Sequence, residues 1–314
     1  MLKNWALLFC LFFAFNSSGQ ILINEYSAAN YAAYADNYGE YEDWVELYNP
    51  TGNSIDLNGW FLTDKTANPT KWTFSSSVII PANGTIVIYC SGRDEIVGGN
   101  IHSNFKITQT KQNETLLLSD LNLVFQDSVN VVPHQDSHSR GRQTDGAASW
   151  GVFANGGTPN SSNVSALEEY ASTPVFSQTS GYYNGGITVS LSSPDSNVTI
   201  YYTTNGDSPD NNSTVYNTPV SVNNTTVLKA VAYSSNASIP SSFIDYHTFF
   251  INDNHTIPIL SISGDSVDML IEDGVLSTGG GWWGGTSLEP RGTIEWFDQN
   301  GVLIDKGTGE FNKH

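Results

Sequence analysis

The clearest alternation of apolar and polar side chains lies between Tyr41 and Pro50, which reads Tyr-Glu-Asp-Trp-Val-Glu-Leu-Tyr-Asn-Pro. One face of this segment would carry Val45 and Leu47, and the other Trp44, Glu46 and Tyr48. A period of two is typical of a strand that is covered on one side. A polar turn follows at residues 49–53, and Leu57 to Asp64 predicts a second aromatic strand. The two strands should therefore meet across a short polar corner, as at the start of an antiparallel sandwich.

Similar short apolar runs, separated by turn residues, recur along most of the chain. We expect further strands at residues 21–26, 71–74, 85–90, 115–119, 123–129, 187–191, 198–202 and 228–232. The 28 glycines and 12 prolines favour such short strands over helices. The predicted fold class is therefore all-β, with two tandem immunoglobulin-like β-sandwiches and an incomplete C-terminal segment.

The N-terminus, residues 1–19, has the pattern of a secretory signal peptide. Lys3 precedes an apolar run from Trp5 to Phe15, and small polar residues follow it. The run is shorter than the roughly 20 residues of a spanning helix, so we expect export and cleavage, and no transmembrane segment in the mature chain. Because Cys10 lies within the run, Cys90 would be the single cysteine left, as a buried and unreactive thiol.

The formal net charge of −19 narrows the classes of partner. Nucleic-acid binding needs clustered lysine and arginine to neutralise phosphates, and the chain has only 12 such residues in all. We therefore expect no nucleic-acid partner, and an extracellular protein or glycan instead.

Acidic residues gather around Gly39, ahead of the Tyr41–Pro50 strand. Carboxylate and amide oxygens beside a residue that can bend sharply suit Ca²⁺, whereas Zn²⁺ prefers nitrogen and sulfur ligands. The candidate ligands are Asp36, Asn37, Glu40, Glu42 and Asp43. Their spacing does not match an EF-hand, and the alternative is a solvated acidic loop. Structural Ca²⁺ is the one cofactor that we consider.

A second polar cluster, residues 133–142, contains His134, His138, Arg140 and Arg142. No third metal ligand and no nucleophile can be identified by spacing. We therefore expect a loop and an exposed edge strand here, and no catalytic residue anywhere in this chain.

Several separated motifs between about residues 21 and 163 give the first domain a family resemblance. They are Ile23-Asn24-Glu25, Asp43-Trp44-Val45-Glu46-Leu47-Tyr48-Asn49, Leu57-Asn58-Gly59-Trp60, Ile79-Ile80-Pro81-Ala82-Asn83-Gly84 and Ser149-Trp150-Gly151. In this order they resemble the lamin tail domain family. The resemblance implies an immunoglobulin-like fold, at residues 20–155, that serves interaction rather than catalysis.

A change of composition predicts a linker at residues 156–172, where glycine, asparagine, serine and proline are frequent. A second β-sandwich should follow at residues 173–252. Its motifs include Gly181-Tyr182-Tyr183, the string from Val198 to Pro209, Thr214-Val215-Tyr216 and the string from Leu228 to Tyr233. They resemble the C-terminal domain of chitobiases and β-hexosaminidases, which accompanies glycosidase catalytic domains and has no catalytic carboxylate pair of its own. Tyr183, Tyr201 and Tyr216 are candidates for stacking on sugars, with packing in the sandwich as the alternative.

The last segment, residues 257–314, resembles the opening of the CotH-like spore-coat kinase family. The resemblance rests on a proline-containing strand at residues 257–263, a turn at Asp273-Gly274 and a strand ending in Phe297-Asp298. The segment also contains a glycine-rich run at residues 279–285. The run lacks the Gly-Lys-Ser/Thr ending of a phosphate-binding loop. The segment also contains no set of catalytic aspartate and metal-binding residues for phosphoryl transfer. The resemblance therefore implies the start of a kinase-like domain, without its activity in this chain.

Together these patterns predict a secreted or cell-surface interaction or adhesion protein built from non-catalytic β-sandwich modules. Two alternatives stay open. One sandwich would be a glycan-binding module, or the chain would be the accessory region of a longer secreted CotH-like kinase.

Overall fold

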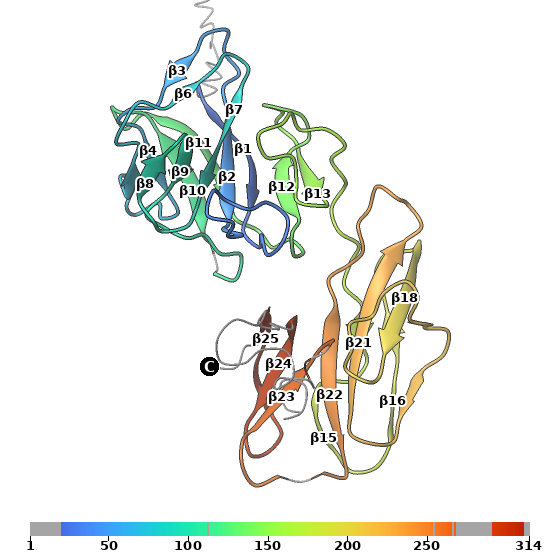
Figure 1. Ribbon diagram of the computed structural model, residues 1–314. Helices are drawn as coiled ribbons and strands as arrows, with labels where there is room; N and C mark the ends of the chain where they lie inside the picture. Colours follow the sequence, from blue (N-terminus) through green and yellow to red (C-terminus); the bar gives the residue numbers. More distant parts are fainter. Residues whose placement is uncertain (1–19, 112, 254, 266, 268–290, 311–314) are drawn as a thin grey trace, which may run out of the picture. The chain divides into compact units, whose positions relative to one another are not determined.

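A computed structural model describes residues 20–111, 113–253, 255–265, 267 and 291–310 (Figure 1). The described residues form β-strands and no α-helix, so the all-β prediction is confirmed. None of them belongs to a helix long and apolar enough to cross a membrane. The chain divides into two compact units, Met1–Leu167 and Glu168–His314. The predicted signal peptide, residues 1–19, lies outside the described residues.

The first unit encloses its core between a seven-stranded and a four-stranded sheet. In sheet order, the larger sheet contains β13 (Trp150–Phe153), β12 (Ser139–Arg142), β1 (Leu22–Ser27), β2 (Trp44–Tyr48), β7 (Thr85–Tyr89), β9 (Asn100–His102) and β8 (Glu95–Val97). The smaller sheet contains β11 (Phe125–Asn130), β10 (Thr115–Ser119), β4 (Phe61–Thr63) and β5 (Trp72–Thr73), and a ribbon pairs β3 (Ile55–Asp56) with β6 (Ile79–Ile80). All neighbours are antiparallel except β7 and β9. Most strands predicted for this half lie within two residues of an observed one.

Strand β2 is covered on both faces rather than on one. Val45 and Leu47 enter the main core, as their alternation predicts. Trp44, on the opposite face, is also fully buried, in a smaller cluster with Val87 and Tyr89. The prediction of a half-covered strand is therefore wrong, because a loop and the segment after β13 cover the second face, as the site geometry below shows.

The two aromatic strands follow one another across a polar corner, as predicted, but they lie in different sheets. Strand β2 pairs with β1 and β7, whereas β4 pairs with β10 and β5 in the other sheet. The fully buried Asn49 explains the change of sheet, because its amide nitrogen donates to the carbonyls of Asn53, Ile80 and Pro81 at 2.8, 3.1 and 2.9 Å. These bonds fix a corner that directs the chain away from a tight hairpin.

The segment around residues 133–142 is not an exposed edge. Strand β12 lies between β13 and β1, and Arg142 is buried. Its guanidinium donates from Nε to the carbonyl of Ile23 (2.8 Å) and from one terminal nitrogen to Asp127 (2.7 Å). The polar sequence misled the prediction because these side chains bond within the protein rather than with water.

His134 is 1% exposed and holds a fixed neutral tautomer. Its Nε2 accepts a hydrogen bond from the Ala28 amide (2.8 Å), so Nδ1 carries the proton and donates to the Gln135 carbonyl (2.9 Å). Burial lowers the pKa of His134 to about 4. Protonation in the folded state would therefore break a buried hydrogen bond.

We expect acid to destabilise the first unit through His134. An unfolded histidine binds a proton near pH 6.5, so this contribution to stability is complete above that pH and is lost as the pH falls towards 4. The loss approaches about 3 kcal/mol. Urea unfolding of wild type and His134→Gln at pH 7 and pH 4.5 measures it, because the other titrating groups are common to both proteins. Parallel pH dependences of the two proteins would contradict the expectation.

The residues of the predicted linker make contacts within each of the two units. Leu167 bonds back to Val152 through both backbone groups, at 2.8 and 3.1 Å. In the second unit the Glu168 amide donates to the Ser238 carbonyl (2.7 Å), and Tyr170 contacts Phe243 with ring centroids 4.9 Å apart. The division between the units falls inside the range 156–172.

The second unit is built around a five-stranded sheet with additional strands on both faces (Figure 1). In order it contains β15 (Gly181–Tyr183), β22 (Asp245–Ile251), β21 (Thr226–Ser234), β18 (Val198–Thr203) and β19 (Thr214–Val215). The ribbons β14 (Val175–Phe176) with β17 (Leu191–Ser192), and β16 (Ile187–Val189) with β20 (Val220–Val222), share a core with one face of the sheet.

The opposite face carries a three-stranded sheet of β23 (Ile259–Ser263), β24 (Arg291–Phe297) and β25 (Leu303–Glu310). Phe250 of β22 meets Phe297 edge to face at 5.1 Å, and the Tyr246 hydroxyl donates to the Gly307 carbonyl at 2.7 Å. The predicted strands at 257–263 and near 297 are therefore confirmed. The glycine-rich run at residues 279–285 lies outside the described residues.

Candidate functional site

The acidic loop between β1 and β2 is closed by one of its own carboxylates. Asp36, whose side chain is fully buried, accepts from the backbone amides of Tyr38 (2.7 Å) and Glu40 (3.0 Å). Gly39 completes the bend with a φ of 80°, which an L-residue rarely adopts. The sharp bend expected at Gly39 is therefore present, and the Asp36 carboxylate stabilises it by accepting from two of its backbone amides.

A guanidinium from a distant part of the chain neutralises the loop. Arg93, which follows β7, lies 2.7 Å from Glu40 and 3.3 Å from both Asp36 and Glu42. Lys106 lies 2.9 Å from the other oxygen of Glu42. The hydrogen bond to Glu40 is the main cause that raises the pKa of Arg93. Three of the five predicted calcium ligands thus gather around one positive charge.

The other two predicted ligands face different partners. Asn37 Oδ1 accepts from Nε2 of the buried His102 (2.8 Å), whose Nδ1 faces the Ser91 hydroxyl at 3.0 Å. Burial lowers the pKa of His102. Asp43 accepts from the Asn30 amide (3.1 Å), and burial raises the pKa of Asp43 to about 7. The structure therefore brings Asp36, Glu40 and Glu42 together around Arg93, whereas Asn37 and Asp43 bond to other residues.

Within the described part of the chain, no group of three or more histidine, cysteine, aspartate or glutamate side chains is arranged to hold a metal. The calcium hypothesis stays a prediction, and the position of Arg93 among three of the candidate ligands suggests a direct test of it. Removing the guanidinium would restore the repulsion between carboxylates that a cation relieves.

We therefore expect millimolar Ca²⁺ to raise the melting temperature of Arg93→Ala more than that of wild type. Calorimetry of both proteins, with Ca²⁺ and with chelator, measures the shift. Lys65→Ala, which removes an exposed positive charge outside the loop, is the control. Coincident curves for Arg93→Ala in the two buffers would refute the calcium hypothesis.

The three tyrosines proposed for sugar contact have different surroundings in the second unit. Tyr183 and Tyr216 pack against its core, where their rings meet Phe249 and Tyr202 edge to face at 5.8 and 6.5 Å. Tyr201 projects from the opposite face of β18 and meets Tyr233 edge to face at 5.6 Å. Tyr183 and Tyr216 thus pack as the alternative expects. Tyr201 is partly buried to a similar degree, but it lies on the other face of the sheet beside a second aromatic ring.

A serine, histidine and aspartate series also lies in this unit, and its side chains bond to the neighbouring strands. The Ser180 amide donates to His247 Nδ1 (3.1 Å), so His247 Nε2 carries the proton and faces Asp245 at 3.5 Å. The Ser180 hydroxyl donates to the buried Glu295 and also lies 2.9 Å from His247 Nδ1. The hydroxyl therefore has a carboxylate as well as an imidazole within hydrogen-bond distance.

Salt bridges and hydrogen bonds make this series a connection between sheets. Glu295 of β24 also accepts from Thr248 of β22 (2.5 Å). Although burial opposes the shift, His247 and Lys306 lower the pKa of Asp245 to about 2, and Lys306 of β25 lies 2.6 Å away. These contacts therefore have a structural role, because they connect β22 to β24 and β25 of the three-stranded sheet.

A buried acidic network in the first unit was not predicted. Glu25 and Glu46 are fully buried, and burial raises the pKa of both, that of Glu46 to about 8. Glu46 accepts from Asn24 (3.0 Å) and from the Asn160 amide (2.7 Å). The position of Glu25 and Glu46 inside apolar strands was the sequence signal for this network, because a buried carboxylate requires hydrogen-bond donors from within the protein.

Comparison with known proteins identifies one part of the chain. A family model described as the chitobiase/beta-hexosaminidase C-terminal domain matches residues 178–243. No curated protein matches the chain. The resemblance predicted for the second sandwich is therefore confirmed over these residues, which form a β-sandwich. The lamin tail and CotH-like resemblances stay predictions.

Proposed function

We propose that this chain is the interaction region of an exported protein, secreted or at the cell surface, in which non-catalytic β-sandwiches bind an extracellular protein or glycan. The match of residues 178–243 to a chitobiase/beta-hexosaminidase C-terminal domain is the observation that carries the proposal. The serine, histidine and aspartate series of the same unit joins two sheets, which further supports a non-catalytic role.

A glycan contact in the second unit would use the aromatic pair of Tyr201 and Tyr233. Tyr183 and Tyr216 pack against the core, whereas Tyr201 lies on the other face of β18. Tyr201 and Tyr233 are partly exposed, and their edge-to-face contact fixes the angle between the two rings. Rings held in this way lose little conformational entropy when a sugar stacks on them.

Binding of the full chain to a glycan array and to insoluble polysaccharides tests this function. Tyr201→Ala should lower retention by about tenfold if one stacked ring is lost. Tyr183→Phe and Tyr216→Phe, which keep the packed rings, should leave retention unchanged. Retention that is equal in Tyr201→Ala and wild type would remove this contact, and the absence of any retained glycan would leave an extracellular protein as the partner to be sought.

For a longer protein that contains this region, the CotH-like kinase stays the alternative. The three-stranded sheet supplies strands where the resemblance expects them. Gene sequence following His314 tests it, because phosphoryl transfer requires a catalytic aspartate and metal-binding asparagine or aspartate residues.

A further inference from the structure

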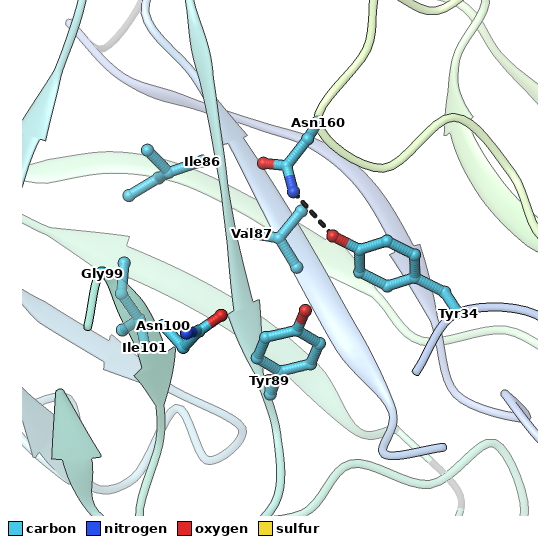
Figure 2. Close-up of a pocket in the computed structure, with 8 residues that line it drawn as sticks. All are labelled: Tyr34, Ile86, Val87, Tyr89, Gly99, Asn100, Ile101 and Asn160. Atoms are coloured by element: carbon cyan, nitrogen blue, oxygen red, sulfur yellow. Dashed lines mark hydrogen bonds between the residues drawn. The ribbon is translucent and has the colours of Figure 1, made fainter. Parts of the chain in front are cut away.

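The first unit has a small hollow beside β7 that none of the features above explains (Figure 2). Its volume is about 130 Å³, and it is partly open to solvent. The residues that shape it are Tyr34, Val87, Tyr89, Asn100, Ile101 and Asn160. They come from the loop before β2, from β7, from β9 and from the segment after β13, so four distant stretches of sequence converge here.

Stacked aromatic rings form one wall of the hollow. The rings of Tyr34 and Tyr89 are nearly parallel, with an angle of 14° and centroids 5.9 Å apart. Tyr89 stacks in turn on His102 at 5.1 Å, and Tyr34 meets the fully buried Trp44 edge to face at 6.0 Å. The wall is therefore fixed before any ligand arrives, which lowers the entropic cost of binding.

Two amides supply polar groups at the rim. Asn160 Nδ2 donates to the Tyr34 hydroxyl (2.6 Å), as Figure 2 shows, and Asn100 Nδ2 faces the Val97 carbonyl at 3.3 Å. Both amide nitrogens are thus oriented by protein contacts. Among the described residues no donor bonds to Oδ1 of either asparagine, so both oxygens are free to accept from a ligand.

The lining selects a neutral ligand. None of the residues that line the hollow is charged. Burial and the neighbouring Tyr34 raise the pKa of Tyr89, and Asp36 adds to the shift, so its hydroxyl stays neutral and an anion would meet an unfavourable field. The exposed lining is mainly polar, so its amides and phenol groups match the hydroxyls of a pyranose, and Val87 and Ile101 supply a smaller apolar part for its C–H groups.

The size of the hollow limits the ligand to one ring. Pockets that enclose drug-sized molecules measure roughly 300–1,000 Å³, well above this volume. We propose that the hollow between Tyr34, Tyr89, Asn100 and Asn160 binds a single neutral monosaccharide unit, at the end or at a branch of a glycan. This site lies in the first unit and does not depend on the aromatic pair of the second.

Saturation-transfer NMR on the full chain tests the site. The probes are the methyl glycosides of glucose, galactose, mannose and N-acetylglucosamine, with glucuronic acid and glucosamine as charged comparisons. We expect saturation of the C–H protons of at least one neutral probe, with a dissociation constant of about 1 mM, as the few atoms of one sugar ring permit. The charged sugars should bind more weakly.

Variants separate this site from the rest of the protein. Tyr34→Ala and Asn160→Ala should each weaken binding by about tenfold or more. Asn160 is exposed, so its substitution reports on binding even if Tyr34→Ala perturbs the fold. Tyr201→Ala should leave the signal unchanged, which distinguishes this site from the contact proposed for the second unit. The proposal is overturned if no neutral probe gives a signal up to about 20 mM, if Asn160→Ala binds as wild type does, or if a charged sugar binds best.

Discussion

Replacing Trp60 with alanine should lower the free energy of unfolding of the first unit by about 3 to 5 kcal/mol. The indole is 5% exposed and lies in the main core, just before β4. The backbone carbonyl of Trp60 accepts from the Phe74 amide at 3.0 Å. This bond holds the backbone in place, so it cannot easily move into the cavity that the substitution would create. A cavity that stays open costs both the lost burial and the lost contacts.

Calorimetry of the full chain measures the effect, since two compact units should give separate transitions. Tyr41→Ala, which removes a ring that is 49% exposed, is the matched control and should cost less than about 1 kcal/mol. A similar small cost for Trp60→Ala would show that the ring does not support the core and would favour a role at the surface.

The strands were predictable because their signal is local, whereas their partners were not. The alternation of apolar and polar residues predicted the bounds of β10, and it predicted a strand one residue shorter than β18. Both predictions succeed because the alternation depends only on neighbouring residues. The pairing of β1 with β12 joins segments more than a hundred residues apart. No short-range pattern encodes such a pairing, and the buried corner at Asn49 looked like an ordinary polar turn.

The acidic loop shows the same limit for the candidate sites. Its carboxylates and its bend at Gly39 follow from the sequence. Their counter-ion, Arg93, lies about fifty positions away and gives no motif that links it to Asp36 or Glu42. The tyrosines of the second unit were likewise identified by type, but alternation along β18 separates the core-facing Tyr202 from Tyr201 only once the sheet is known.

The buried Glu25 should hold the segment after β13 onto the first unit. The carboxylate accepts from the Thr158 amide (2.9 Å), the Thr158 hydroxyl (2.6 Å) and the Ser139 hydroxyl (2.5 Å). Gly157 has a φ of 76°, and a Cβ there would collide with Glu25 and Ser139. A chain that ends at Asn155 would therefore lose two of the three donors to this carboxylate, together with the residues that cover it.

We expect residues 20–167 to unfold cooperatively, and residues 20–155 to be less stable by about 3 kcal/mol or more, since each buried polar group left unpaired costs about 1–3 kcal/mol. Glu25→Ala in the longer chain should cost a similar amount by leaving the Ser139 and Thr158 donors unpaired, and it should raise amide exchange in residues 157–163. Asp120→Ala, which removes an acid from an exposed turn, is a control for charge and should leave exchange in residues 157–163 unchanged. Equal stability of the two chain lengths would mean that residues 156–167 form the free linker that their composition predicts.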